Sequence, residues 1–249
     1  MDYDKTEIAS SYDQARALAP ETRRLWKNLL AAHIDPAAIS LVIDLGSGTG
    51  RFSELLAAHF GARVIGIEPS QKMVDQARRK ATSGDVIYRR GSGEAIPLPD
   101  ARADLVFMSQ IFHHLTDPNA VVKECRRVLR PGGYACIRNG TREADYPHRH
   151  FFPLQALIDS DLTSRREIRS VFAAGGFAPV VHQVVTQVIA GDWQSFVAKS
   201  ELRADSFLAR LSDEDFREGM AALRTPGDTI DPNAPVTEEI DWFVFLRQA

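Results

Sequence analysis

Short aliphatic runs alternate with helical patterns over residues 41–138, and no other feature of this sequence restricts its fold as strongly. Most of the runs are apolar at consecutive positions, which is typical of parallel strands that are buried on both faces. The alternation predicts an α/β, doubly wound, mostly parallel sheet, and such a sheet binds its ligand beyond the carboxyl ends of its strands. The predicted strands are residues 41–45, 63–68, 85–90, 104–109 and 134–138.

Capping residues mark the helix boundaries between these runs. Ser70 is a preferred N-cap residue, and the helix after it places Met73 and Ala77 on one face. Another apolar stripe starts at Val121 and stops at Pro131, which cannot continue a helix. These patterns place helices between successive strands, as a doubly wound fold requires.

The rest of the chain departs from simple alternation. Residues 10–33 predict one or two helices before the first strand, while residues 178–190 and 238–248 predict two late strands that bring the sheet to seven. A helix is expected from Ser164, because Ser164 and Glu167 have the spacing of a capping box. The loop before that helix is rich in aromatic residues and histidines and shows no clear period.

A long insertion separates the two late strands. It has about forty-five residues, although a hairpin needs only a few connecting residues. Apolar residues at helical spacing, among them Trp193, Phe196 and Met220, predict helices with a core of their own. We expect this insertion to lie over the carboxyl edge of the sheet as a lid. The alternatives are that its helices pack on the far side of the sheet or form a dimer contact.

Composition narrows the class of protein. With 249 residues, of which 44% are hydrophobic and 25% charged, the chain is typical of a globular protein and not of a disordered or fibrous one. A formal net charge of -3 gives no general reason to bind nucleic acid or an anionic membrane. The N-terminus lacks the pattern of a signal peptide and no apolar run approaches a membrane span, so a cytoplasmic protein is expected. The two cysteines, Cys125 and Cys136, indicate a reduced compartment and supply neither a disulfide framework nor a cysteine zinc site.

Three glycines at alternate positions follow the first predicted strand, in the stretch VIDLGSGTGRF. Gly46, Gly48 and Gly50 permit positive φ angles and let main-chain N–H groups approach a ligand closely. A dinucleotide fingerprint needs its third glycine where this chain has Arg51, and a phosphate loop needs a Gly-Lys-Ser/Thr ending that this stretch lacks. The turn therefore predicts a polar ligand of another kind, and a plain strand-to-helix turn is the alternative.

These residues resemble the class I S-adenosylmethionine-dependent methyltransferases, in particular small-molecule enzymes of the methyltransferase type 11 kind. The resemblance covers residues 10–140. VIDLGSGTG is similar to the first motif of the family, and VIGIEPS is similar to the end of its second strand. GSGEAIPLPD resembles the loop that borders the adenine, while MSQIFHHLTDP and CRRVLRPGGYACI resemble the fourth and fifth strands with the turn between them. The resemblance implies a Rossmann-like methyltransferase fold and S-adenosyl-L-methionine as the cofactor.

The resemblance also implies which residues hold the cofactor. Glu68 would accept hydrogen bonds from both ribose hydroxyls, and a solvated strand end is the alternative. Asp44 lies in an aliphatic run where an unpaired carboxylate is costly to bury, so its partner is the ammonium of the cofactor, main-chain N–H groups of the glycine turn, or a purely structural cap. Tyr12 and Arg16 resemble an element that closes over the carboxylate of the cofactor, or they form a solvated helix face. Ser92 stands where the family commonly has an acid, so adenine contact would depend on its hydroxyl and on the main chain that follows. The implied cofactor-binding residues are Tyr12, Arg16, Asp44, Gly46, Ser47, Gly48, Gly50, Glu68, Pro69, Ser70, Met73, Ser92, Gly93, Glu94, Ser109 and Gln110.

Histidines follow the fourth predicted strand, where donor and acceptor should meet. His113 and His114 are candidate catalytic residues, because an imidazole titrates in the range useful to a general base. A hydrogen bond that holds the loop is the alternative for either ring. His148 and His150 either face the same pocket or belong to an ordinary polar loop. The four rings lack the close spacing with an acid that a metal site needs, so no metal is predicted.

The sequence predicts an enzyme that methylates an oxygen or nitrogen atom, in preference to carbon, of a small and partly apolar molecule, as a monomer or homodimer. A non-catalytic binding module and a nucleotide-dependent oxidoreductase are the alternatives. A nucleic-acid methyltransferase is disfavoured, because SQIFHH replaces the Asn-Pro-Pro-aromatic stretch of amino-directed DNA enzymes. We expect one domain over residues 1–249, with an N-terminal helical cap (1–35), a cofactor-binding core (36–140), and an acceptor-side loop and lid (141–162 and 191–230).

Overall fold

Seven strands form one sheet in the part of the chain that the computed structural model describes, namely residues 19–203, 205, 207–225, 227 and 230–249. Their order is β3-β2-β1-β4-β5-β7-β6, and neighbours are parallel except that β7 is antiparallel to both β5 and β6. The predicted seven-stranded, mostly parallel sheet is confirmed. The strands are β1 (Leu41–Leu45), β2 (Arg63–Glu68), β3 (Val86–Arg90), β4 (Ala103–Ser109), β5 (Leu129–Asn139), β6 (Phe177–Ala190) and β7 (Val236–Arg247).

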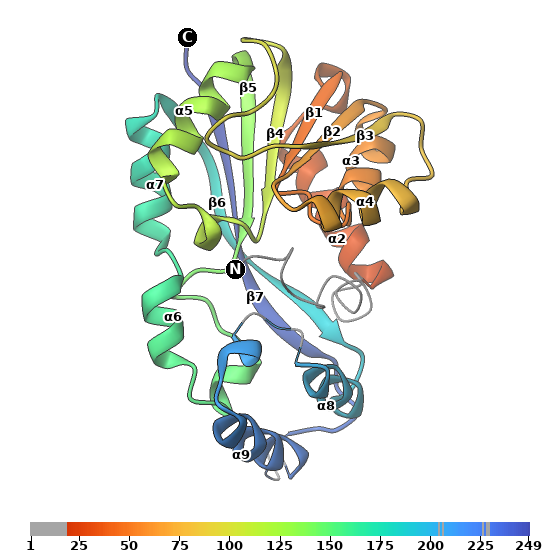
Figure 1. Cartoon of the computed structure of the whole chain (residues 1–249), viewed down its shortest axis with the longest axis vertical. Coiled ribbons are helices and arrows are strands. Elements are labelled where there is room, and N and C mark those ends of the chain that lie inside the picture. Colours follow the sequence, from red (N-terminus) through yellow and green to blue (C-terminus); the bar gives the residue numbers. More distant parts are fainter. Residues whose placement is uncertain (1–18, 204, 206, 226, 228–229) are drawn as a thin grey trace.

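The strand order reverses between β1 and β4, which are neighbours in the sheet but not in the sequence. At such a switch point the connections leave toward opposite faces, so a crevice opens beyond the carboxyl ends of the two strands. Figure 1 shows β6 and β7 extending past these ends toward a group of helices at the lower end of the view. Because β7 is antiparallel to β5, its first residues lie at the edge where β5 ends.

Helices cover both faces of the sheet, as a doubly wound fold requires. One face carries α2 (Pro20–His33), α3 (Ser53–Phe60) and α4 (Gln71–Lys80), with the 3-10 turn η2 (Pro36–Ala38) leading into β1; the other carries α5 (Pro118–Val128) and α7 (Arg165–Ala174). Trp26 is 1% exposed and meets Trp242 edge to face on the first side. On the second side Phe172 stacks on Phe245, with 4.3 Å between ring centroids. The two cores hold the sheet rigid beneath its carboxyl edge.

Two predicted helix starts are confirmed in atomic detail. The Ser70 hydroxyl accepts a hydrogen bond from the main-chain N–H of Met73 at 3.3 Å, which caps α4. Ser164 and Glu167 form a full capping box at the start of α7, since each side chain accepts from the main-chain N–H of the other residue. Such caps satisfy N–H groups that a helix leaves unpaired in its first turn.

The long connection between β6 and β7 folds into helices that share a third hydrophobic core. This helical insertion, residues 191–235, contains α8 (Trp193–Glu201), η5 (Leu208–Arg210) and α9 (Asp213–Arg224). Phe196 and Met220 are buried in that core, as their spacing predicted. The last residue of β6, Ala190, is paired with Val236, the first residue of β7, so the insertion begins and ends at one point of the sheet.

The stretch between β5 and α7 contains regular structure where the sequence predicted an aperiodic loop. η4 (Pro147–His150) and α6 (Gln155–Asp161) lie there and complete the third core through Phe152 and Ile158. The prediction was wrong because α6 has only 7 residues and buries one of them, Ile158, which is too little to show a helical period. A helix this short forms through its tertiary contacts.

The two cysteines are both buried and free, Cys125 in α5 and Cys136 in β5. Burial raises the pKa of the Cys125 thiol to about 12, so it stays protonated at neutral pH. Among the described residues, no helix combines the length and the hydropathy that crossing a bilayer would take.

Candidate active site

A cavity of about 470 Å³ opens at the carboxyl edge of the sheet, between the sheet and the helical insertion. Its walls on the sheet side include Gly46, Gly48 and Glu68, while Phe196 and Leu208 of the insertion belong to the opposite wall. A smaller cavity of about 30 Å³ shares four lining residues with it: Gly46, Gly48, Arg51 and Ser109. Gly46, Gly48 and Glu68 thus border the same space as the insertion.

The glycine turn after β1 has a positive φ angle at each of its three glycines: 69° at Gly46, 55° at Gly48 and 81° at Gly50. A Cβ on Gly46 would lie 2.4 Å from the side chain of Ile111, and one on Gly50 would lie 2.2 Å from the hydroxyl of Tyr88. A Cβ on Gly48 would meet nothing within 4 Å. Two of the glycines therefore make room for protein side chains, and Gly48 is the one that faces open space.

Glu68 ends β2 with its carboxylate fixed on both sides. It is 6% exposed, which rules out a solvated strand end. One of its oxygens accepts from the main-chain N–H of Gly48 and the other from that of Ser70, both at 3.0 Å. Each carboxylate oxygen can accept more than one hydrogen bond, so these two contacts do not prevent Glu68 from accepting from a ligand in the cavity.

Asp44 lies deeper, beside the smaller cavity, and is 2% exposed. Its Oδ2 accepts a hydrogen bond from the Ser53 hydroxyl at 2.6 Å, a partner that the sequence did not suggest. Burial raises the pKa of Asp44 to about 6, and the nearby charge of Glu68 also raises it, whereas the Ser53 hydrogen bond and the charge of Arg51 lower it. Desolvation is the largest effect, so ionisation of this carboxyl is costly and a nearby cation would reduce the cost.

Replacing Asp44 by asparagine is expected to make the ligand-free protein more stable at neutral pH. The pKa of Asp44 is about 6 in the folded protein and 3.8 in the unfolded chain, so between these values the folded state binds the proton more tightly. The free energy of unfolding therefore decreases as pH rises from about 4 to about 6. Asparagine removes this loss, on the order of 1 to 3 kcal/mol at pH 7. Urea unfolding at pH 4 and pH 7 measures it, with wild-type protein as the reference. An equal pH dependence in both proteins would contradict the assignment.

The remaining predicted donor residues fall into three groups. Pro69, Met73, Ser92, Gly93, Glu94, Ser109 and Gln110 line the larger cavity together with Glu68. Ser47 lines the smaller one, while Ser70 caps α4 and holds Glu68. Tyr12 and Arg16 lie outside the described residues. Gln110 has a φ angle of 57° and bridges the ends of β4 and β5, since its side-chain oxygen accepts from the main-chain N–H of Gly140 at 2.7 Å.

The candidate catalytic histidines lie in the 3-10 turn η3 (Phe112–His114) and border the larger cavity, with 4.0 Å between the ring centroids of His113 and His114. Desolvation by the surrounding protein lowers the pKa of His114 to about 4. Such a ring is uncharged at neutral pH but a weak proton acceptor, because an effective base has a pKa near the working pH. The general-base role stays a prediction, and the pKa of His114 argues for a hydrogen-bonding role there.

The other two histidines are separated by the fold. His148 lines the cavity, where its Nε2 lies 2.9 Å from the Ser200 hydroxyl. His150 points away to Asp145, with 3.2 Å between Nε2 and Oδ1, and its side chain is 60% exposed. No group of three or more metal-ligating side chains occurs in the part of the chain that the structure describes.

The late strands bring polar residues to the cavity that the sequence analysis did not identify. Arg138, next to last in β5, is 2% exposed, and its guanidinium carbon lies 4.8 Å from the ring centroid of Trp26. It donates to the Ser109 hydroxyl at 3.2 Å and to the side-chain oxygen of Gln187 at 2.8 Å. Gln187 in turn donates to Glu238 Oε1 at 2.6 Å. A single charge inside the aliphatic run YACIRN could have indicated Arg138, as it did Asp44.

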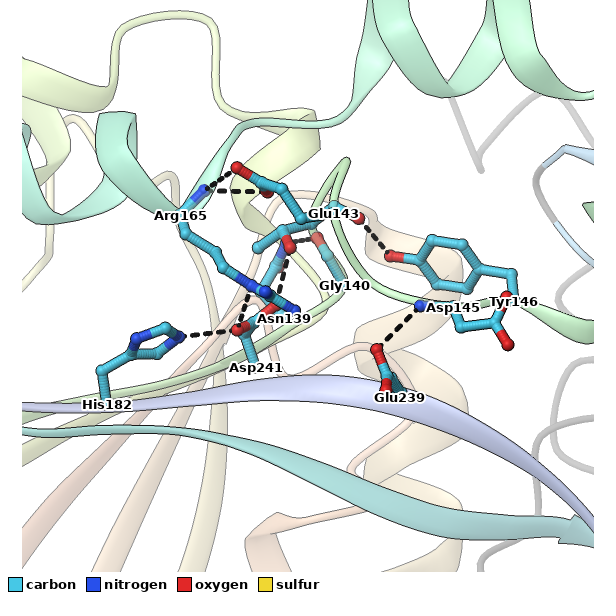
Figure 2. A network of polar contacts seen from close by, with 10 residues as sticks. Asn139, Gly140, Glu143, Asp145, Tyr146, Arg165, His182, Glu239 and Asp241 are labelled. Carbon is cyan, nitrogen blue, oxygen red and sulfur yellow. Dashed lines mark hydrogen bonds and ion pairs between the residues drawn. The ribbon is translucent and has the colours of Figure 1, made fainter.

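The buried carboxylate of Asp241 anchors β7 close to these polar residues. Asp241 accepts from the Thr141 hydroxyl at 2.6 Å and from Arg165 Nε at 2.8 Å, and His182 Nε2 lies 2.6 Å from it. Figure 2 shows His182 of β6 and Arg165, at the start of α7, pointing toward Asp241. The loop after β5 is held further along by Tyr146, whose hydroxyl donates to the main-chain oxygen of Thr141 at 2.9 Å. Tyr146 is thereby placed in the cavity wall.

The sequence is similar to those of known methyltransferases. The methyltransferase domain family matches residues 43–137, from β1 to β5. A probable S-adenosylmethionine-dependent methyltransferase of Mycolicibacterium smegmatis is 31% identical over 206 residues, which cover 76% of this chain and 78% of that protein. A ubiquinone/menaquinone biosynthesis C-methyltransferase of a Caulobacter species is 30% identical over 142 residues, or 52% of this chain and 56% of that protein. The chain spans about half the length of several such relatives.

Solved structures share the fold over nearly the whole chain. A phosphoethanolamine N-methyltransferase of Haemonchus contortus superposes with a TM-score of 0.64 at 17% identity, covering 97% of this chain and 57% of that one. A geranyl diphosphate C-methyltransferase of Streptomyces coelicolor gives a TM-score of 0.59 at 18% identity, covering 98% and 86%. At such identities the likeness concerns the fold, which therefore includes the late strands and the helical insertion.

Proposed function

Since the chain belongs to the family of S-adenosylmethionine-dependent methyltransferases, we propose that it transfers a methyl group from S-adenosylmethionine to an oxygen or nitrogen atom of a small organic molecule. The observation that carries the proposal is the joint position of Gly48 and Glu68. An open backbone position and a fixed carboxylate meet in one cavity wall, 3.0 Å apart from nitrogen to oxygen. That pairing suits a ligand with a vicinal diol that must lie close to the main chain.

The residues present fit the cofactor part by part. Glu68 has two oxygens to accept the ribose hydroxyls, and Gly48 leaves room for the body of the molecule. Ser92 and Gly93 would border the adenine. Asp44, whose raised pKa favours a nearby cation, would face the ammonium group of the amino acid part. Ser47 lines the same small cavity, and its hydroxyl is buried without a hydrogen-bond partner among the described residues.

S-adenosylmethionine supplies an electrophilic methyl group on a sulfonium centre. The protein then has to orient the acceptor in line with it and exclude water, and these two effects can provide most of the acceleration. The helical insertion forms the wall opposite Glu68. This wall would help both to orient the acceptor and to exclude water. His113 and His114 border the space where an acceptor proton would be lost, and they remain the candidate groups for receiving it or for holding the loop.

The acceptor side of the cavity supports a partly apolar substrate. Its wall includes Leu154, Ile158 and Phe196, all at most 2% exposed, from the third hydrophobic core. Burying an apolar body there contributes about 25 cal/mol per Å² of surface removed from water. Carbon is the alternative methyl acceptor, since three relatives are named as C-methyltransferases.

Isothermal titration with S-adenosylhomocysteine tests the donor site. Wild-type protein should bind it, and the Glu68→Ala variant should bind it about 1 to 3 kcal/mol more weakly, because ribose hydroxyls would lose their buried acceptor. Glu218→Ala is the control, since Glu218 is an exposed carboxylate of α9. Unchanged affinity in Glu68→Ala would remove the ribose assignment. Binding of NAD in place of S-adenosylhomocysteine by the wild-type protein would contradict the proposed function.

A further inference from the structure

A row of hydrogen bonds runs along the cavity wall from the glycine turn to the late strands. Ser109, which borders both cavities beside Gly48, accepts from Arg138. Arg138 donates to Gln187, and Gln187 donates to Glu238. All four side chains line the larger cavity. Ser109 begins the row beside the glycine turn, and Glu238 is its other end.

The side-chain amide of Gln187 has a fixed orientation. Its oxygen accepts from Trp26 Nε1 at 2.9 Å and from Arg138 at 2.8 Å, and both of these groups can only donate. The amide nitrogen is therefore the atom that faces Glu238. At 4% exposure Gln187 has little freedom to turn. It holds one carboxylate oxygen of Glu238 in place, and the contact lies between directly paired strand positions, Gln187 of β6 and Glu238 of β7.

Glu238 presents this fixed carboxylate to the cavity. It is partly exposed, and the hydrogen bond from Gln187 engages its Oε1. Burial, followed by the charges of Glu238 and Asp241, raises the pKa of the Tyr146 hydroxyl, so the carboxylate is close to a ring in the same wall. β7 itself is held here by Asp241, three residues along the strand (Figure 2).

The surroundings of Glu238 determine what it can recognise. The acceptor side combines apolar residues such as Leu154, Phe196 and Leu208 with polar ones, among them His148, Lys199, Ser200 and Asp205. The ammonium of Lys199 donates to the main-chain oxygen of Ile189 at 2.6 Å. Gln187 engages one oxygen of Glu238, so a ligand that supplies an N–H or O–H to the other oxygen is favoured over one that cannot. A carboxylate also repels anionic ligands.

We propose that Glu238 selects the methyl acceptor by accepting a hydrogen bond from its amine or hydroxyl group, while the third core holds an apolar body. This inference rests on the proposed function and narrows it to amphipathic amines and alcohols. Glu238 is a specificity-determining residue in this account, and Gln187 and Arg138 are positioning residues that act through it. Phosphate- or carboxylate-bearing molecules are correspondingly disfavoured.

Four probes of one shape test the selection: 3-phenylpropylamine, 3-phenylpropanol, the methyl ether of that alcohol, and 3-phenylpropanoate. Their affinities are measured by ligand-observed NMR titration of the full chain in the presence of S-adenosylhomocysteine. Wild-type protein should bind the amine and the alcohol at least about tenfold more tightly than the ether and the carboxylate. In Glu238→Gln the preference for amine over ether should fall to less than about threefold, and in Glu238→Leu the alcohol should lose its preference as well.

Glu218→Gln is the matched control, because it removes the same charge from an exposed site on α9 and should leave all four affinities unchanged. Thermal unfolding and titration with S-adenosylhomocysteine show whether each variant is folded, and donor affinity should be the same in all of them. An amine preference that survives in both Glu238 variants would overturn the inference. So would tightest binding of the carboxylate, which would point to Arg138, or no amine binding up to its solubility limit. Failure of the wild-type chain to bind S-adenosylhomocysteine would instead defeat the proposed function.

Discussion

Replacing Gly48 by valine is expected to abolish S-adenosylhomocysteine binding while the protein stays folded. A Cβ at this position would meet nothing within 4 Å, so the valine branch is expected to project into the cavity that the cofactor is proposed to fill. The φ angle of 55° strains a β-branched residue, and such strain costs on the order of 1 to 3 kcal/mol of folding stability. We expect the affinity to fall by more than about 100-fold, or roughly 2.7 kcal/mol. Isothermal titration measures the affinity, and circular dichroism monitors the fold.

The neighbouring glycines provide the controls for that experiment. An alanine at position 46 would press on Ile111, and one at position 50 would press on Tyr88, at 2.4 and 2.2 Å respectively. Both substitutions should lower the melting temperature, because protein atoms must move. Gly48→Val should instead lose affinity for S-adenosylhomocysteine, and its melting temperature should fall less than those of the two alanine variants. If Gly48→Val binds within about tenfold of wild type, or is the least folded of the three, Gly48 serves packing and not ligand access.

Local patterns in the sequence were sufficient for the elements that depend on near neighbours. The strands were predicted because their residues are apolar at consecutive positions, and Ser70 and Ser164 were recognised as caps because capping depends on residues three positions apart. The glycine turn was recognised from its own residues and the role of Glu68 from the resemblance, and Gly46, Gly48 and Glu68 do share a cavity wall. Each of these inferences uses a short stretch of chain.

Contacts between distant residues were beyond such patterns. Gly46 lines both cavities, yet the space that its Cβ would occupy is filled by Ile111, and the space beside Gly50 is filled by Tyr88. Gln187 lies in an ordinary strand pattern, and its importance comes from Trp26, 161 positions earlier in the chain. Glu238 is one of two adjacent glutamates, and only the strand register shows which of them pairs with Gln187. Sequence spacing carries no record of such pairings, since the sheet creates them.

The helical insertion is the subject of the second large expected effect. Replacing residues 191–235 by a four-residue Gly/Ser link should leave donor binding intact and reduce methyl transfer by orders of magnitude. The link can close because Ala190 and Val236 are already paired across β6 and β7. Glu68 and the glycine turn lie on the opposite wall and keep their contacts to each other. The acceptor, in contrast, would lose Phe196 and Leu208 from its wall, and water would reach the reacting atoms.

The measurement pairs titration of S-adenosylhomocysteine with product detection by mass, using an acceptor from a metabolite screen of the wild-type enzyme. Removing the insertion uncovers Phe152 and Ile158 of the third core, so a second variant keeps the insertion and opens it: Phe196→Ala. That change deletes a ring whose centroid lies 4.7 Å from that of His148. It should lower the rate of methyl transfer to the acceptor more than the affinity for S-adenosylhomocysteine. Full activity in the shortened chain would show that the insertion has no part in catalysis. Loss of donor binding in both variants would show instead that it supports the cofactor cradle, because the glycine turn and Glu68 would then depend on a wall they do not touch.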